Sequence, residues 1–294
     1  MSKSCRFLYK NKRLLKDTSD KSYIFNIYSL HGFTGSGEDF SLLNTSIESY
    51  LEGLPVFINW HCPSLPGHGD SSDLDCTIKG QYDFLDQYIK TRRSHAKACH
   101  ETKVCKNILI AYSMGSRLGL YHAIQQTDFW DAVVLIGVNP GIQSEIERAK
   151  RRESDKEMAE KIGKHGLAWF LDFWKELPLI KTQSKAPDDF YRAMHERKKS
   201  LNSKGVQKSL VDFGQGVFPD LWGEIHHIQS PILLINGNLD VKYCEISQKI
   251  SEAHTNAEFH SINDCGHAPH IENALATAKA ITAFLKQRLF KSLY

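Results

Sequence analysis

One serine lies in a pattern typical of a reactive nucleophile. Residues 111–115 read Ala-Tyr-Ser-Met-Gly, directly after the apolar run NILI and directly before a helical pattern. Small residues around Ser113 permit a nucleophile elbow, the strained strand-to-helix turn that lifts a serine hydroxyl above a sheet. The sequence therefore predicts Ser113 as the reactive hydroxyl of an enzyme.

A serine hydroxyl needs a base and an acid, which follow an elbow in the order Asp or Glu, then His. Asp240 ends the segment PILLINGNLD, and His267 ends the segment DCGH. Both follow predicted strands at their carboxyl ends, where doubly wound sheets bind ligands. We expect Asp240 and His267 to complete a triad. His270 is the chief alternative base, and Asp264 is a poorer alternative acid because it lies only three residues from the imidazole.

The anion formed in such a reaction needs hydrogen-bond donors. The apolar segment YIFNIYSL runs into His31-Gly32-Phe33-Thr34-Gly35. A turn of this kind, together with the residue after the nucleophile, supplies the backbone N–H groups of an oxyanion hole. We therefore assign the hole to Phe33 and Met114. A second turn of this type, residues 65–71, is expected to have a structural role.

The elements that must position these residues form an α/β pattern. Short apolar runs without clean alternation are typical of strands in a parallel sheet covered by helices. Helical patterns lie between them, among them residues 115–126 and 272–290. The predicted strands cover residues 23–30, 56–62, 107–113, 132–138, 231–237 and 257–263.

Residues 141–225, which we call the cap, break this rhythm. They contain amphipathic, charge-rich segments and no strand pattern, including EIERAKRRESDKEMAEKIGKHG and LAWFLDFWKEL. A helical insertion between two halves of a sheet is the simplest arrangement. We expect an N-terminal extension (1–22), an α/β core (23–140 and 226–294) and this cap.

Composition excludes several classes of function. The chain has 294 residues, of which 41% are hydrophobic, and a net charge of +3. So small an excess does not indicate nucleic acid as a partner. No run of 18 apolar residues exists, and charges interrupt the first 22 residues, so we expect neither a membrane span nor a signal peptide. The expected compartment is the cytosol, and the oligomeric state is left open.

The seven cysteines predict reduced thiols, because they are odd in number and form no CxxC pair. His95, Cys99, His100 and Cys105 cluster, but their spacing matches no zinc-finger or ribbon pattern. We therefore expect no metal and no other cofactor.

Five segments resemble the α/β-hydrolase superfamily, and in particular its 2-succinyl-6-hydroxy-2,4-cyclohexadiene-1-carboxylate (SHCHC) synthases. They are LHGFTGS, LPGHGDSS, YSMGSR, NPGIQSEIERAKRRESD and DCGHAPHIEN, and the similarity runs from about residue 24 to 286. The resemblance implies an α/β-hydrolase fold, a mostly parallel doubly wound sheet with a helical cap in its second half. Two positions depart from the family pattern, Ala111 and Ser116 in place of glycine, and both are small enough to keep the turn.

Arginines make the resemblance more specific. Arg117 lies four residues after Ser113, and Arg148, Arg151 and Arg152 follow Pro140-Gly141. A planar guanidinium can bind a carboxylate through two hydrogen bonds, which suits a substrate with several carboxylates. We expect Arg117 and Arg151 to contact a small anionic substrate.

The resemblance implies further contacts in the cap and beside the nucleophile. A third family arginine corresponds to Arg197 or Lys198, and the spacing to Gly205 does not decide which. Trp174 matches a cap aromatic of the family and is equally suited to the pocket wall or to the cap core. We also count Tyr112, which precedes the nucleophile, among the substrate contacts.

Two reactions fit these residues. The resemblance implies a lyase that eliminates pyruvate from 2-succinyl-5-enolpyruvyl-6-hydroxy-3-cyclohexene-1-carboxylate in menaquinone biosynthesis, with proton abstraction by Ser113 and His267. The alternative is a serine hydrolase in which Ser113 attacks an ester, thioester or carbon–carbon bond of an anionic molecule. The arginines favour the lyase. A pseudo-enzyme is disfavoured because every catalytic position is filled.

Overall fold

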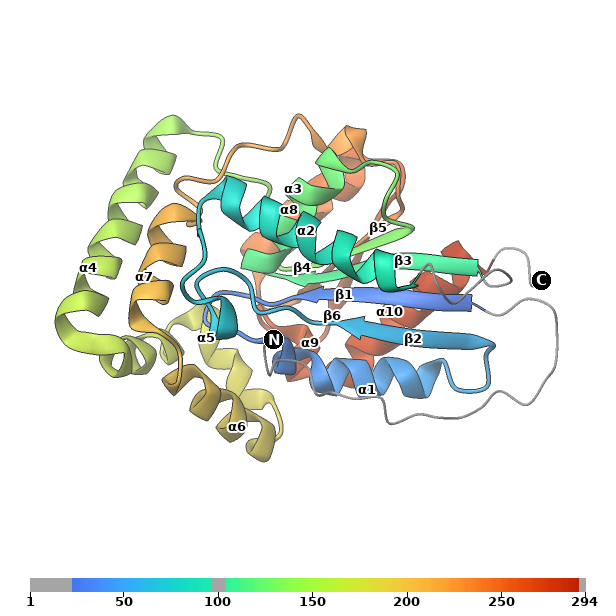
Figure 1. Cartoon of the computed structure of the whole chain (residues 1–294), viewed down its shortest axis with the longest axis horizontal. Helices are drawn as coiled ribbons and strands as arrows, with labels where there is room; N and C mark the ends of the chain where they lie inside the picture. The colour runs from blue at the N-terminus through green and yellow to red at the C-terminus, as the bar shows by residue number, and fades with distance from the viewer. Residues whose placement is uncertain (1–22, 97–103, 291–294) are drawn as a thin grey trace.

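A six-stranded parallel sheet forms the centre of the molecule (Figure 1). The computed structural model describes residues 23–96 and 104–290; the predicted N-terminal extension lies outside them, as do Cys99 and His100. The strand order is β2-β1-β3-β4-β5-β6, and every neighbouring pair is parallel. The strands are β1 (Tyr23–Leu30), β2 (Val56–His61), β3 (Val104–Tyr112), β4 (Ala132–Ile136), β5 (Ile232–Gly237) and β6 (Ala257–Ile262).

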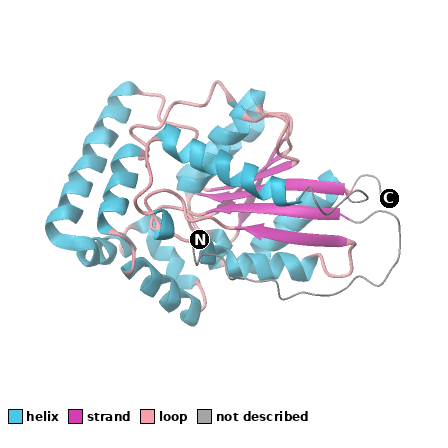
Figure 2. Cartoon of the chain, viewed as in Figure 1, coloured by secondary structure: helices cyan, strands magenta, loops and turns pink. Residues whose placement is uncertain are grey.

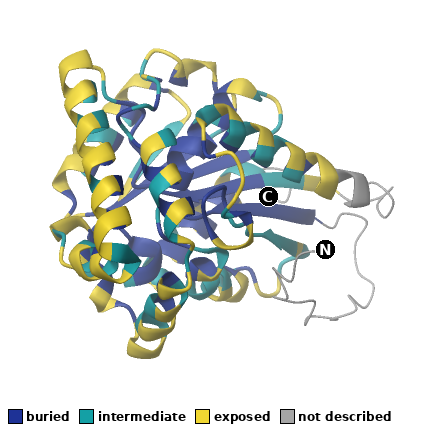
Figure 3. Cartoon of the chain, turned by 60° about the vertical axis from the view of Figure 1, so that its left-hand side comes forward, coloured by how far each residue is buried: buried dark blue, intermediate teal, exposed yellow. Residues whose placement is uncertain are grey.

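Helices cover both faces of the sheet (Figure 2). On one face pack α1 (Ser41–Tyr50) and α10 (Ala274–Leu289). On the other pack α2 (Ile78–Ala96), α3 (Met114–Gln125) and α8 (Val241–Ala253). The central strands β1, β4 and β5 are buried along their whole length (Figure 3), as a sheet covered on both faces requires. The predicted parallel α/β sheet is thereby confirmed.

Four α-helices lie between β4 and β5 in the chain, beyond the carboxyl ends of the strands (Figure 1). The longest of them packs lengthwise against α7 around its own small apolar cluster, which includes Ile162, Phe170 and Val206. No strand occurs between residues 141 and 225; the division of the chain into core and cap stays a prediction. The helices are α4 (Glu145–Lys175), α5 (Pro178–Lys181), α6 (Asp188–Lys199) and α7 (Ser203–Asp212).

Of two helical regions, one agrees with the sequence prediction and the other differs from it. The cap segments EIERAKRRESDKEMAEKIGKHG and LAWFLDFWKEL are the two halves of α4, which meet at a kink where Gly166 leaves helical geometry (φ 86°, ψ 165°). This kink lies at the boundary between the two predicted segments. The helix expected over 272–290 is instead the end of the short α9 (Pro269–Glu272) followed by α10. Asn273 separates them because its side chain accepts a hydrogen bond from Ala276 N and so caps α10.

Candidate active site

Ser113 sits in the strained turn that its neighbours predict. Its backbone has φ 51° and ψ −107°, between the last residue of β3 and the first residue of α3. A Cβ on Gly115 would lie 2.2 Å from the carbonyl oxygen of Leu30, so only glycine permits the close approach of α3 to β1. Ser116, one of the two departures from the family pattern, bonds through its hydroxyl to Ala111 O (2.7 Å) and Ile136 O (2.8 Å).

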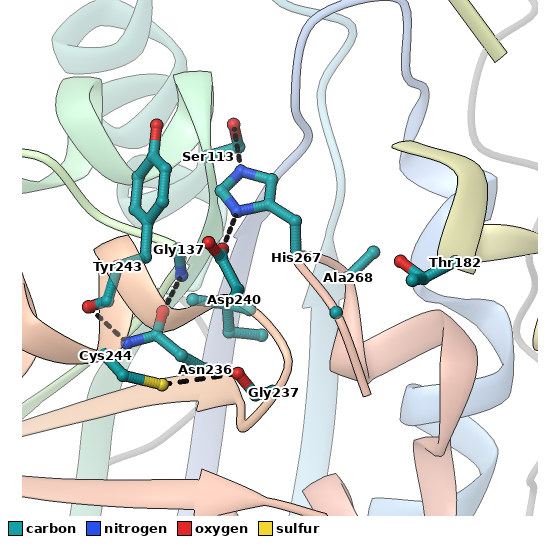
Figure 4. Close-up of polar contacts among 12 residues, drawn as sticks. Ser113, Gly137, Thr182, Asn236, Gly237, Asp240, Tyr243, Cys244, His267 and Ala268 are labelled. Atoms are coloured by element: carbon teal, nitrogen blue, oxygen red, sulfur yellow. Dashed lines mark hydrogen bonds and ion pairs between the residues drawn. The ribbon is translucent and has the colours of Figure 1, made fainter. Parts of the chain in front are cut away.

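The structure brings Ser113, His267 and Asp240 together (Figure 4). His267 Nε2 lies 3.0 Å from Ser113 Oγ, and His267 Nδ1 lies 2.7 Å from Asp240 Oδ2. Nδ1–H therefore donates to the carboxylate, which leaves Nε2 free to accept the serine proton. The side chains of His267 and Asp240 are only 1% and 5% exposed, so water competes little for these bonds.

The alternative base, His270, and the alternative acid, Asp264, do not form the hydrogen bonds of a triad. His270 packs its ring between Phe40 and Tyr112, and neither of its nitrogens has a hydrogen-bond partner among the described residues. Asp264 has φ 57°, and its backbone carbonyl accepts from Lys185. The geometry therefore favours His267 and Asp240 over this pair.

Two strand ends and a helix start set the position of the carboxylate. Asn236, in β5, accepts from Gly137 N (3.1 Å) and donates to Tyr243 O (2.9 Å) in the first turn of α8 (Figure 4). These bonds hold the loop that presents Asp240. Gly137 has φ 62°, and a Cβ there would lie 2.6 Å from the His267 ring, so glycine makes room for the imidazole.

A single carboxylate clamps the loop on either side of His267. Glu272 accepts from Gly266 N (2.6 Å) and Ala268 N (3.0 Å). Its Oε1 also accepts from Thr182 Oγ1 (2.9 Å), on the cap side of the site. Sequence reasoning missed this residue, because only the folded loop reveals that one side chain reaches both amides.

The predicted oxyanion turn is held by two buried histidines. His31 Nδ1 donates to Gly32 O and its Nε2 accepts from Leu65 N (3.0 Å). His68 Nε2 accepts from Thr34 N (3.1 Å), and burial lowers the pKa of His68 to about 3, so the ring is neutral. These bonds link the turn at 31–35 to the turn at 65–69, which agrees with the structural role expected for the latter.

Both predicted oxyanion segments approach Ser113. A Cβ on Gly32, beside Phe33, would lie 3.5 Å from Ser113 Cβ. Met114 is the first residue of α3, where backbone N–H groups have no partner within the helix and the helix dipole favours an anion. The Met114 side chain is buried and accepts a weak hydrogen bond from Ser209 of the cap.

Arg117 lies one turn after Ser113 on α3 and is only 7% exposed. Its guanidinium lies 5.3 Å from the ring centroids of both Phe213 and Phe218. Among the described residues, Nη1 is buried with no hydrogen-bond acceptor. Burial lowers the pKa of Arg117 to about 10, so the group still carries its charge at neutral pH.

The cap arginines have partners within the chain. Arg151 Nε donates to Asp155 Oδ1 (2.8 Å), and Arg151 Nη1 donates to Gln215 Oε1 (3.2 Å). Arg197 pairs with Asp39 at 2.8 Å. Arg148 and Arg152 both pair with Glu145 near the start of α4.

Lys198, the alternative to Arg197, is buried, and burial lowers its pKa. Its Nζ bonds to Gln183 Oε1 (3.4 Å), and Gln183 Nε2 bonds to the Tyr112 hydroxyl (3.3 Å). Lys198 is thus linked through one side chain to the residue before the nucleophile. Trp174 stacks edge-on against Phe33 (5.5 Å) and lies 5.2 Å from Phe170 in the cap cluster, so it contacts both the oxyanion turn and the cap core.

No group of three or more metal-ligating side chains occurs among the described residues. Of the predicted cysteine and histidine cluster, only Cys105 has a described side chain, and it lies exposed in β3. Across residues 23–96 and 104–290, none of the helices is both long enough and apolar enough to span a membrane.

A model of the alpha/beta hydrolase family matches residues 28–280. The chain belongs to this family. It is 30% identical over 262 residues to a putative SHCHC synthase of Bacillus subtilis (strain 168), a match that covers 88% of this chain and 89% of the relative. The SHCHC synthase of Enterobacter sp. (strain 638) is 25% identical over 260 residues, covering 88% and 91% of the two chains.

Solved structures of other proteins share the fold. MenH from S. aureus superposes with a TM-score of 0.76 at 24% identity, covering 93% of this chain and 96% of that one. A thermophilic esterase from Thermogutta terrifontis has a TM-score of 0.72 at 17% identity, covering 91% of both. The predicted α/β-hydrolase fold and the resemblance to SHCHC synthases are confirmed.

Proposed function

We propose that this chain is an SHCHC synthase-like lyase that eliminates pyruvate from 2-succinyl-5-enolpyruvyl-6-hydroxy-3-cyclohexene-1-carboxylate. Relatives that bear the name of this enzyme align over most of both chains. The serine, imidazole and carboxylate lie in hydrogen-bond order, as proton transfer at a carbon atom requires.

The buried cation of Arg117 is the observation that carries this proposal. A generic esterase has no use for a guanidinium one turn beyond its nucleophile. Arg117 Nη1 has no hydrogen-bond acceptor among the described residues, and the charge of Asp155 acts on it without a hydrogen bond. A buried charge with so few partners is costly, and a ligand carboxylate that forms two hydrogen bonds with it offsets that cost. Arg117 therefore supports a substrate with a carboxylate near the reacting atoms.

In the proposed mechanism, His267 Nε2 accepts the Ser113 proton, and Ser113 Oγ takes the proton from the ring carbon next to the succinyl ketone. The ketone oxygen gains negative charge, which the N–H groups of Phe33 and Met114 stabilise. The electron pair moves through the ring double bond and breaks the carbon–oxygen bond to the enolpyruvyl group. That group leaves as the enolate of pyruvate and takes up the proton that His267 accepted, which gives pyruvate and returns the triad to its starting state. The reaction therefore needs no cofactor and no covalent enzyme intermediate.

The other predicted substrate contacts differ in whether they already have a partner within the chain. Arg151 is available to a second carboxylate only in competition with Asp155, and Arg197 only in competition with Asp39. We assign the third cationic contact to Lys198, because it is buried and linked through Gln183 to Tyr112. Tyr112 and Trp174 complete the proposed walls.

The hydrolase alternative stays open because its first step uses the same Ser113–His267 hydrogen bond. In that reaction Ser113 attacks a carbonyl carbon and water later releases the acyl group. An anionic substrate would again use Arg117. For either reaction we expect a small-molecule substrate. We also expect the cytosol as the compartment, since Cys76, Cys244 and Cys265 carry free thiols.

The deciding experiment is to incubate the protein with the enolpyruvyl substrate and measure pyruvate release. We expect release by the wild type and almost none by Ser113→Ala. Ser230→Ala is the matched control, because Ser230 is also buried but bonds to Trp130 O. Wild-type protein that releases no pyruvate would overturn the lyase.

A further inference from the structure

Tyr243 joins the triad to the cap. It is buried in the first turn of α8, three residues after Asp240. Its ring centroid lies 4.5 Å from that of His267, and its hydroxyl accepts a hydrogen bond from Gln215 Nε2 (2.9 Å). Nothing in the mechanism above uses this hydroxyl.

The direction of the Tyr243 proton follows from the partners of Gln215. Arginine only donates hydrogen bonds, so Gln215 must turn its carbonyl oxygen toward Arg151 Nη1. Its amide nitrogen, also a donor, then faces the Tyr243 hydroxyl. The phenol oxygen is therefore an acceptor in this bond, and its own proton must point elsewhere.

That proton has no acceptor in the part of the chain that the structure describes. In Figure 4 the Tyr243 hydroxyl and the Ser113 hydroxyl lie at the same side of the imidazole, opposite Asp240. Burial raises the pKa of the Tyr243 hydroxyl. The positive charges of Arg117 and Arg151 oppose this rise, and the negative charge of Asp240 adds to it. A neutral donor beside two cations and the reactive serine is well placed to bind an anionic oxygen.

We propose that the Tyr243 hydroxyl donates a hydrogen bond to a carboxylate oxygen of the substrate, with its proton aimed there by Gln215 and Arg151. This inference rests on the proposed function, because it takes the ligand to be the anionic substrate held by Arg117. It makes Tyr243 a specificity-determining residue and Gln215 a positioning residue that acts through it.

Removal of the hydroxyl tests the contact. Tyr243→Phe should raise KM for the enolpyruvyl substrate about 10- to 100-fold, the range for one lost hydrogen bond to a charged group, and change kcat little. Tyr82→Phe is the matched control, since Gln126 Nε2 donates to the Tyr82 hydroxyl (2.7 Å) away from the site. An unchanged KM in Tyr243→Phe overturns the proposal.

Reversal of the bond separates this role from a structural one. Gln215→Glu keeps an acceptor for Arg151 but turns a second acceptor toward Tyr243, so the phenol proton is diverted to the carboxylate. The added carboxylate also repels an anionic substrate directly, so we expect at least the rise in KM seen for Tyr243→Phe and a clearly smaller effect when Gln215→Glu is made in the Tyr243→Phe background. If Gln215→Glu raises KM by the same factor in both backgrounds, the effect is one of charge alone and the proposal is overturned.

A binding measurement keeps the result independent of the reaction. Succinate, a small dicarboxylate, is titrated by calorimetry into wild type, Tyr243→Phe and Tyr82→Phe. We expect weaker binding by about 10-fold or more in Tyr243→Phe only. If the wild type releases no pyruvate but this difference is found, the lyase fails and the Tyr243 contact stands. Equal affinities in all three proteins overturn the contact.

Discussion

Arg151 and Asp155 face each other across one turn of α4, with 2.8 Å between Nε and Oδ1. Burial raises the pKa of Asp155, and the neighbouring Arg151 opposes that rise. A substrate carboxylate that approaches Arg151 must therefore compete with a carboxylate of the chain itself. Arg117 has no hydrogen-bonded carboxylate among the described residues, and Asp155 acts on it only through its charge. The two arginines therefore differ in how readily a substrate can reach them.

This difference predicts that Arg117 contributes more to substrate recognition than Arg151. Arg117→Ala should lose about 2–5 kcal/mol of transition-state stabilisation, the range for truncation of one partner of a desolvated charge pair. Arg117→Lys should recover only part, because an ammonium lacks the two-pronged geometry. The measurement is kcat/KM for the enolpyruvyl substrate in both variants and in Arg151→Ala.

Hydrolysis of a neutral p-nitrophenyl ester is the control for Arg117, since that reaction needs no cationic contact. The melting temperature of Arg117→Ala should be unchanged or higher, because the substitution removes a buried charge without a full set of partners. Equal losses with anionic and neutral substrates would assign Arg117 a structural role.

The triad makes a second prediction. Ser113→Ala, His267→Ala and Asp240→Asn should each lower turnover by several orders of magnitude, because the three groups act as a unit. Circular dichroism should report an unchanged fold. Asp264→Asn serves as the comparison. If Asp264→Asn loses activity and Asp240→Asn keeps it, the acid of the triad is Asp264 and the assignment of Asp240 is wrong.

A third prediction separates lyase from hydrolase chemistry. The proposed elimination forms no bond to Ser113, whereas hydrolysis passes through an acyl-enzyme. Mass spectrometry of protein quenched during turnover should give the unmodified mass. An adduct on Ser113 with the natural substrate would replace the lyase with the hydrolase, whereas labelling by a phosphonate probe is expected for both.

Glu272 predicts that the loop around His267 depends on one carboxylate. Glu272→Gln should place an amide N–H group against a backbone N–H of Gly266 or Ala268, and a buried donor without an acceptor costs about 1–3 kcal/mol. We expect a lower kcat from a misplaced imidazole, with KM changed less. Thr182→Val, which removes only the bond from the cap side, should reduce kcat less than Glu272→Gln does.

Buried histidines predict loss of stability in acid. Burial lowers the pKa of His68 and His270 to about 3 and that of His122 to about 4, against 6.5 for the ordinary side chain. The unfolded chain therefore binds protons below pH 6.5 that the folded chain excludes. The free energy of unfolding should hold above pH 6.5 and fall as the pH drops from 6.5 toward 3.

Urea denaturation between pH 4.5 and 7.5 measures this dependence. His270→Leu should reduce the slope by up to about 1.4 kcal/mol per pH unit, since one excluded proton is removed. His226→Asn is the control, because His226 is exposed at the surface. A slope in His270→Leu equal to that of the wild type would contradict the prediction.

Local patterns made the elbow and the sheet predictable. Ser113 has its strand, turn and helix within a few residues, and the order of Asp240 and His267 follows from the elbow scheme. Tyr243 and Gln215 were out of reach, because Gln215 meets Arg151 across 64 positions of sequence. Only the packing of α4 against the segment after α7 brings them together.

The cap shows the same limit at shorter range. Arg197 and Lys198 are adjacent in sequence but point about 100° apart on a helix. Arg197 is partly exposed and pairs with the buried Asp39, whereas Lys198 is itself buried. Spacing to Gly205 cannot reveal which side of α6 faces the site. The kink at Gly166, in contrast, lies where the two predicted cap segments meet, because glycine marks that boundary in the sequence.

The elbow has a consequence for how such chains are detected. Of the small residues around Ser113, Gly115 is irreplaceable, because any side chain there meets the backbone of Leu30 and His31. Ala111 fits its buried place in β3. The Ser116 hydroxyl has hydrogen-bond acceptors in the carbonyl oxygens of Ala111 and Ile136. A motif that demands glycine at all three places would discard this chain, whereas one that demands glycine only two residues after the serine, and any small residue at the other two, would retain it.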